Sequence, residues 1–223
     1  MENIHIFDVK IQGLTVKEAM RQVIEYLNTD VLNTVEIMTM DMLMQGQDNA
    51  DWKEKAAQLD LVLPGEREIL DAVKIQDRIL IRDVENSVFL KMFLKYFQKN
   101  HKKVFLLAED EEEAAVLAEE MGRYHRGIVI TGSFILPREE GQIENVINEI
   151  NGTETDCLVS VLSSPWQEEF IAAQRALLNV RLWLGCGDTL RQIYKEKRTG
   201  GKVRKFFLKK VFRYKVEKEK KEN

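Results

Sequence analysis

The sequence predicts an α/β fold in which a mostly parallel sheet is covered by helices on both faces. Two observations carry this prediction. Short apolar runs rich in β-forming residues recur along the chain, and amphipathic stretches with helical periodicity lie between them. Strands that alternate with helices, and that are apolar throughout, are typical of a buried parallel sheet.

The elements can be assigned in chain order. A short strand is expected at residues 3–8, and the helix after it begins where Thr15 and Glu18 have the spacing of a capping box. Further strands are predicted at 35–40, 59–64, 103–108, 127–132, 156–162 and 180–185. Helices are predicted at 86–99, 110–124, 138–150 and 166–178.

The composition indicates one globular domain followed by a tail. The chain has 223 residues, of which 44% are hydrophobic and 31% charged, so it can bury a substantial core. It has no apolar run near 18 residues, and its first ten residues lack the pattern of a signal peptide. We therefore expect a cytoplasmic protein.

The cysteines and histidines do not indicate a metal centre. Cys157 and Cys186 both fall in strand-like apolar runs, where buried thiols are expected rather than a disulfide. His5, His101 and His125 are scattered without the spacing of metal ligands. The sequence predicts no structural metal.

Charge is distributed unevenly between the body and the tail. Residues 197–223 contain 12 basic and 3 acidic residues, whereas residues 1–196 contain 21 basic and 34 acidic ones. The body therefore carries −13 and the tail +9. Such asymmetry predicts that the tail meets an anionic surface, and we divide the chain into a domain at 1–196 and a tail at 197–223.

Ligands of open α/β sheets bind outside the carboxyl ends of the strands, so these ends are the first places to search. They read TMDM at 39–42, PGERE at 64–68, TGSF at 131–134, SSPWQEE at 163–169 and GCGD at 185–188. In the fourth of these, Ser163 or Ser164 can cap a helix whose first turn contains Gln167. A well-capped helix start would by itself explain this pattern.

The order of these motifs resembles the WecG/TagA/CpsF family of bacterial glycosyltransferases from about Ile4 to Val216. IMTMD lies where the family has Thr-x-Asn, LDLVLPGERE where it has a strand ending in Pro-Asp-Gly, and ITGSF where it has a Gly-Tyr-Phe turn. The specific part is Pro-x-Gln-Glu at 165–168, followed by Gly-x-Gly at 185–187.

The resemblance implies a Rossmann-like fold and a transferase without cofactor or required metal. Such an enzyme moves an N-acetylhexosamine, typically N-acetylmannosamine, from a UDP-sugar onto a polyprenyl-diphosphate-linked acceptor with inversion. Family members build teichoic-acid linkage units, enterobacterial common antigen or capsule. A catalytically degenerate relative that binds a sugar nucleotide at the membrane is the alternative. A different nucleotide-binding α/β protein is a third.

The resemblance also assigns substrate-binding residues position by position. They are Thr39, Arg82, Thr131, Gly132, Gln167, Glu168, Gly185 and Gly187. Arg82 corresponds to an arginine that contacts the substrate phosphates, for which a guanidinium fork is well suited. Without the resemblance, Thr39 could equally be a strand residue and Arg82 a surface charge.

The general base is the main departure from the family pattern. The family has the Asp of Pro-Asp-Gly where this chain reads Pro64-Gly65-Glu66. Glu66, one residue further on, and Asp41, where the family has Asn, are the candidate catalytic carboxylates. In addition, Trp166 replaces the family's lysine, which removes a cation from the phosphate side.

The tail is predicted to be an amphipathic helix that lies on a membrane surface. On a helix, Val203, Phe206, Phe207, Val211 and Tyr214 fall broadly on one side, with Lys205, Lys209 and Lys210 toward the other. We expect Lys205, Phe206, Lys209, Lys210 and Arg213 to contact an anionic inner leaflet. This makes the protein peripheral on the inner face of the cell membrane.

Two other interpretations of the tail remain. The basic segment could bind nucleic acid, but the acidic body and the lack of a nucleic-acid motif make us expect no such partner. Alternatively, its apolar side packs against the domain or against a second subunit of a homo-oligomer.

Overall fold

A computed structural model describes the backbone of residues 2–136, 143–194 and 202–222. The side chains of residues 2, 3, 202–207 and 222 lie outside this description. Residues 138–142, the start of the helix predicted at 138–150, also lie outside it. The side chains of Lys205 and Phe206, two predicted membrane contacts, are therefore not described.

The fold is built on a six-stranded sheet in which every strand pair is parallel. Its order is β4-β3-β8-β7-β5-β6. The strands are β3 (Asn33–Met38), β4 (Leu61–Pro64), β5 (Lys103–Ala108), β6 (Val129–Ile135), β7 (Cys157–Ser160) and β8 (Leu182–Gly185). All six were expected from the sequence, and the predicted α/β class is confirmed. β4, β7 and β8 are buried along their whole length, as strands covered on both faces must be.

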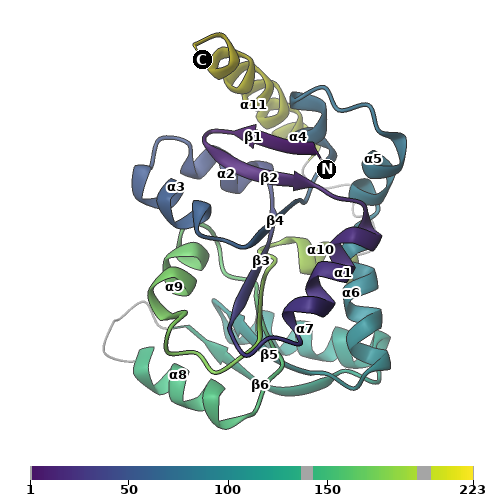
Figure 1. The fold of residues 1–223 in the computed structure, drawn as a ribbon, viewed down its shortest axis with the longest axis vertical. Coiled ribbons are helices and arrows are strands. Elements are labelled where there is room, and N and C mark those ends of the chain that lie inside the picture. Colours follow the sequence, from purple (N-terminus) through teal and green to yellow (C-terminus); the bar gives the residue numbers. More distant parts are fainter. Residues whose placement is uncertain (1, 137–142, 195–201, 223) are drawn as a thin grey trace.

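Helices cover both faces of this sheet (Figure 1). On one face, α1 (Val16–Tyr26), α6 (Val88–Lys99) and α7 (Glu111–Tyr124) enclose one apolar core with the strands. On the other, α8 (Ile143–Gly152) and α9 (Trp166–Gln174) enclose a second. The capping box expected at the start of α1 is present: the Thr15 hydroxyl accepts from the Glu18 N–H, and the Glu18 carboxylate accepts from the Thr15 N–H.

Several short elements were not predicted. They are α2 (Met40–Gly46), α3 (Ala50–Ala57), α4 (Arg67–Ala72), α5 (Arg78–Glu85) and α10 (Thr189–Tyr194). Most are a turn or two long, so they give too few repeats of an apolar pattern to be recognised. Three of them, α2, α4 and α10, directly follow the ends of β3, β4 and β8.

A separate antiparallel hairpin lies beside the main sheet. It pairs β1 (Glu2–Ile6), which was expected, with β2 (Val9–Gly13), which was not. Phe7 and Asp8 form its two-residue turn, with φ values of 51° and 65°. Positive φ at both positions is what a tight hairpin requires, but Asn or Gly usually occupies them, so this turn carried no sequence signal.

The C-terminal helix α11 (Lys202–Glu222) packs on this hairpin, as Figure 1 shows at the top of the molecule. Phe212 and Val216 are completely buried in a third apolar core that includes the hairpin and α2 to α4. The Phe212 ring meets the Phe7 ring edge-on at 6.1 Å, and the Phe7 N–H donates to the Glu219 carboxylate at 3.1 Å. For this part of the tail, the structure agrees with the alternative in which it packs against the domain.

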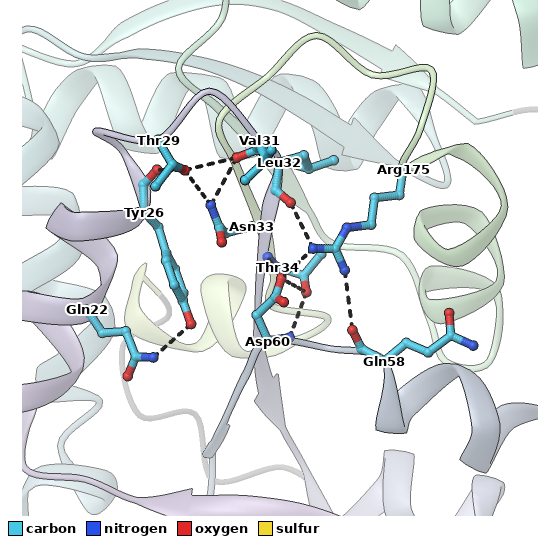
Figure 2. Close-up of polar contacts among 10 residues, drawn as sticks. All are labelled: Gln22, Tyr26, Thr29, Val31, Leu32, Asn33, Thr34, Gln58, Asp60 and Arg175. Carbon is cyan, nitrogen blue, oxygen red and sulfur yellow. Dashed lines mark hydrogen bonds and ion pairs between the residues drawn. The ribbon is translucent and has the colours of Figure 1, made fainter.

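The amino ends of β3 and β4 are joined by a polar network around Arg175 (Figure 2). The Arg175 guanidinium donates to the Asp60 carboxylate at 2.8 Å and to the Leu32 carbonyl at 2.9 Å. Asp60 also accepts from the backbone N–H and the hydroxyl of Thr34, at 2.7 and 2.9 Å. The network fixes the sheet at the end opposite to the strand exits.

Candidate functional site

The ends of five parallel strands converge on one cleft of about 410 Å³. Its walls come from the segments that directly follow β3, β4, β5, β7 and β8. They include Thr39, Asp41, Glu66, Glu109, Asp110, Glu113, Ser163, Ser164, Gly187, Asp188, Arg191 and Gln192. This is where an open parallel sheet offers a ligand site, because the chain leaves the sheet there and helices begin.

Thr39, Asp41 and Glu66 are brought together at the rim above β3 and β4. Thr39 caps α2, its hydroxyl accepting from the Met42 N–H at 3.3 Å. The Glu66 carboxylate accepts from the Met40 N–H at 3.0 Å, so it satisfies a second free donor of the same helix. The two candidate bases therefore lie on one side of the cleft, and their positions are set by the start of α2.

Position 65 has no room for a carboxylate in this backbone. A Cβ atom added to Gly65 would lie 2.8 Å from the Met38 carbonyl oxygen and 2.9 Å from Ile37 Cγ2. The Gly65 N–H donates to that same carbonyl at 2.7 Å, which holds the two chains at this close distance. Glu66 is consequently the carboxylate that this turn presents to the cleft.

The opposite wall centres on an arginine that was not predicted. Arg191 of α10 forms ion pairs with Glu113 at 2.6 Å and with Asp188 at 2.8 Å. Burial raises the pKa of Glu113, and the nearby Arg191 charge opposes that rise.

Glu109 accepts from the Ser163 N–H at 2.5 Å and so joins the ends of β5 and β7.

The described walls are strongly acidic. Asp41, Glu66, Glu109, Asp110, Glu113 and Asp188 face a single cation, Arg191, among the lining residues that the structure describes. Several of these acids cap helices or pair with Arg191. Their combined field nevertheless disfavours an unaccompanied anion and favours groups that donate hydrogen bonds. Within the described parts of the chain, no three His, Cys, Asp or Glu side chains gather as a metal site.

Gln167 and Glu168 lie behind the cleft wall, not in it. Both are fully buried in the first turn of α9. The Gln167 amide donates to the Glu36 carboxylate, and both oxygens of Glu168 accept from the Ser164 hydroxyl. Ser164 thus bonds Glu168 in place of the helix cap expected from the sequence.

Gly185 and Gly187 have different roles in the same region. Gly185 ends β8 directly against the Glu36 carboxylate, where an added Cβ would overlap its oxygens. Gly187 lines the cleft with a φ of 47°, a conformation that glycine adopts without strain.

Three residues implied by the resemblance lie away from the cleft. Arg82 sits on α5 with its side chain 68% exposed and pairs with Asp83 at 3.1 Å. Thr131 and Gly132 fall inside β6, which continues to Ile135, so the expectation that the strand ends at 132 is wrong. The Thr131 hydroxyl bonds the Val104 carbonyl and Thr155.

A groove of about 470 Å³ shares Glu66 and Gln192 with the cleft and leads to α11. Lys209 and Arg213 of α11 line it. Lys209 forms an ion pair with Glu68, and Arg213 with Asp71 at 3.1 Å. Two of the cations predicted to meet lipid therefore pair with α4, whereas Lys210 is exposed.

Sequence reasoning missed Arg191, Asp188, Glu109 and Ser164 as cleft residues. Glu109 directly follows the strand predicted at 103–108, whose exit was not among those searched, whereas Ser164 and Asp188 lie within exits that were searched but were not assigned to the site. Arg191 is the third residue of α10, a short helix that was not predicted, and only the fold brings it to the cleft.

Comparison with known proteins identifies the chain at the level of a family. The family model described as glycosyl transferase WecG/TagA/CpsF matches residues 4–217. No curated protein gives a match. Among the helices that the structure describes, none has both the length and the apolar character needed to cross a bilayer.

Proposed function

Because this chain belongs to the WecG/TagA/CpsF family of glycosyl transferases, we propose that it transfers an N-acetylhexosamine, most simply N-acetylmannosamine, from a UDP-sugar. The acceptor is a polyprenyl-diphosphate-linked sugar, and the product enters a cell-envelope polymer such as teichoic acid or capsule. The observation that carries the proposal is the convergence of five strand exits, with Thr39 and Glu66, on one cleft.

The proposed reaction is a single displacement that needs no metal. Glu66 takes the proton from the acceptor hydroxyl as that oxygen attacks the anomeric carbon. The bond between the anomeric carbon and the UDP oxygen breaks on the opposite face, so the configuration inverts and UDP leaves. Asp41 is the second candidate base. Among the described cleft residues, Arg191 is the cation that stabilises the departing diphosphate.

The experiment is UDP release from UDP-N-acetylmannosamine with a short lipid-diphosphate acceptor. We expect Glu66→Gln to lower kcat by about 10²- to 10⁴-fold, since this is the usual contribution of a general base. Asp41→Asn is expected to change kcat by less than about 10-fold. Glu119→Gln, which neutralises an exposed acid on α7, is the control for loss of charge alone.

The two carboxylate variants also distinguish the candidates. A large loss in Asp41→Asn with a normal Glu66→Gln would transfer the role of base to Asp41. If neither variant differs from the parent in turnover, neither carboxylate is the base.

The second candidate function is a sugar-nucleotide-binding or regulatory module without turnover. Two observations favour it: Gly65 stands where the family has its carboxylate, and the described cleft walls hold six acids for one arginine. In that case the parent binds UDP but releases none from the donor.

The acceptor is a membrane lipid, so the proposed site of action is the inner face of the cell membrane. Val211 and Tyr214 of α11 support this because they are 44% and 67% exposed, whereas Phe212 and Val216 are buried. An exposed apolar edge on a basic helix suits an anionic leaflet. Binding of this kind weakens as salt rises.

A further inference from the structure

Behind one wall of the cleft lies a buried polar cluster that the proposed reaction does not use. It consists of Glu36 of β3, Trp52 of α3, Ser164, and Gln167 and Glu168 of α9. Glu36, Trp52, Gln167 and Glu168 are completely buried, and Ser164 is 7% exposed. Ser164 is the member of the cluster that lines the cleft.

Two neighbours fix the hydrogen bonds of the Ser164 hydroxyl. The Trp52 Nε1–H donates to Ser164 Oγ at 2.9 Å. The hydroxyl in turn donates to Glu168, whose Oε2 and Oε1 lie at 2.9 and 3.0 Å. Since indole N–H can only donate, Trp52 always uses one lone pair of the oxygen.

The remaining capacity of Ser164 follows by counting. A serine hydroxyl has one proton and two lone pairs. Glu168 takes the proton and Trp52 takes one lone pair, which leaves one lone pair that neither of them uses. Ser164 is therefore held as a hydrogen-bond acceptor toward the ligand.

Glu168 offers both of its oxygens to the Ser164 hydroxyl, which suits a carboxylate as acceptor. It is the third residue of α9, where the partial positive charge of the helix start stabilises a carboxylate. Burial raises the pKa of Glu168, and the hydrogen bonds from its own N–H and from Ser164 oppose that rise. Burial, and then the neighbouring Glu168, raise the pKa of Glu36 well above its ordinary value.

We propose that Ser164 is a specificity-determining residue that accepts a hydrogen bond from a hydroxyl or amide N–H group of the donor sugar. This inference rests on the proposed function and names the part of the donor that the Ser164 wall recognises. The carboxylates of the cleft are also acceptors, so this side of the cleft suits a sugar and not a phosphate. A hydroxyl held this way rejects a group that cannot donate.

The test compares two ligands by titration calorimetry, UDP and UDP-N-acetylmannosamine, with the parent and Ser164→Ala. The variant is expected to bind the sugar nucleotide about 3- to 10-fold more weakly, the usual effect of one hydrogen bond. Its affinity for UDP should stay within about 2-fold of the parent, which also shows that the cleft is folded. Ser133→Ala, at an exposed position on β6, is the matched control.

Ser164→Cys provides a second variant if alanine does not fold, because it keeps the shape of the side chain but is a weak acceptor. Equal losses for both ligands, or no loss for either, would overturn the inference while leaving the proposed function intact. A parent that binds neither ligand would contradict both.

Discussion

The turn at Gly65 and Glu66 decides which of its residues can present a carboxylate to the cleft. The sequence shows which residues stand at this turn, but not how closely they are packed. The backbone at position 65 lies within contact distance of the Met38 carbonyl, and only the fold reveals this approach. Glu66 then reaches the cleft from the adjacent position and also caps α2.

An aspartate at position 65, the residue that the resemblance implies for this turn, should therefore destabilise the protein. We expect Gly65→Asp to lower the free energy of unfolding by about 1–3 kcal/mol, because the added atoms crowd the Met38 carbonyl. Urea denaturation measures the change. The matched control is Gly122→Asp on α7, where an added Cβ meets nothing within 4 Å. Equal effects of the two substitutions would mean that the turn at Gly65 is not crowded.

The raised pKa of the single residue Glu36 should make the stability of the protein depend on pH. Its pKa is raised well above 4.5 in the folded chain, so the folded state binds more protons than the unfolded state. Its contribution to stability is full below the ordinary pKa and is lost as pH rises through the raised value. A tenfold difference in proton affinity between the folded and unfolded states is worth about 1.4 kcal/mol.

Glu36→Gln removes this ionisation and keeps the shape. We expect the variant to lose less stability than the parent as the pH is raised above the ordinary pKa of a glutamate, as followed by urea denaturation at each pH. Glu119→Gln, an exposed acid, should follow the parent curve. If Glu36→Gln also follows the parent curve, Glu36 does not titrate in this range.

At the scale of elements, the strands were predictable and the short helices were not. Strands such as β5 are continuous apolar runs, since both faces of the sheet are covered, and its predicted bounds match the structure. The limits of β6 could not be read in this way, because its residues are only partly buried. That error put Thr131 and Gly132 at a strand exit that lies further along the chain.

The helix α11 combines a buried face with an exposed one. Phe212 and Val216 join the core around the hairpin, while Val211 and Tyr214 remain exposed. The sequence predicted an amphipathic helix, but not that Phe212 would be the residue that docks it. The apolar side expected from the sequence included Val211 and Tyr214, but tertiary packing buries Phe212 and Val216 instead.

Substitutions on the two faces should separate stability from membrane binding. We expect Phe212→Ala to lower the free energy of unfolding by about 3–5 kcal/mol, the usual cost of removing a buried phenyl ring. Tyr214→Ser should change stability by less than about 0.5 kcal/mol and weaken binding to anionic liposomes. Unfolding curves and liposome sedimentation measure the two effects. Unchanged sedimentation of Tyr214→Ser would remove this residue from the membrane surface.

At the scale of the whole molecule, the unequal charges of body and tail meet in the groove beside the cleft. Lys209 and Arg213 pair there with acids of α4, so part of the basic tail neutralises the acidic body. The charge asymmetry was visible in the sequence. The groove was not, because it depends on how α11 packs.

The candidate site was predictable to the extent that it follows strand ends. Thr39, Asp41, Glu66 and Gly187 line the cleft because each comes directly after a strand. Arg82 lies on α5, the second helix after β4, and its side chain is exposed outside the cleft. Gln167 and Glu168 were expected at the sheet edge, but both are buried, and the partner of Gln167 is Glu36, which lies 131 residues away in the sequence.

The central claim is that this cleft binds the sugar nucleotide. Titration of the isotope-labelled protein with UDP-N-acetylmannosamine, followed by amide chemical shifts, tests it most directly. The account predicts that the largest shifts fall on the residues after the strands, at 39–41, 66, 163–164 and 187–191. Shifts confined to the separate groove between α8 and α9, with these amides unmoved, would contradict it.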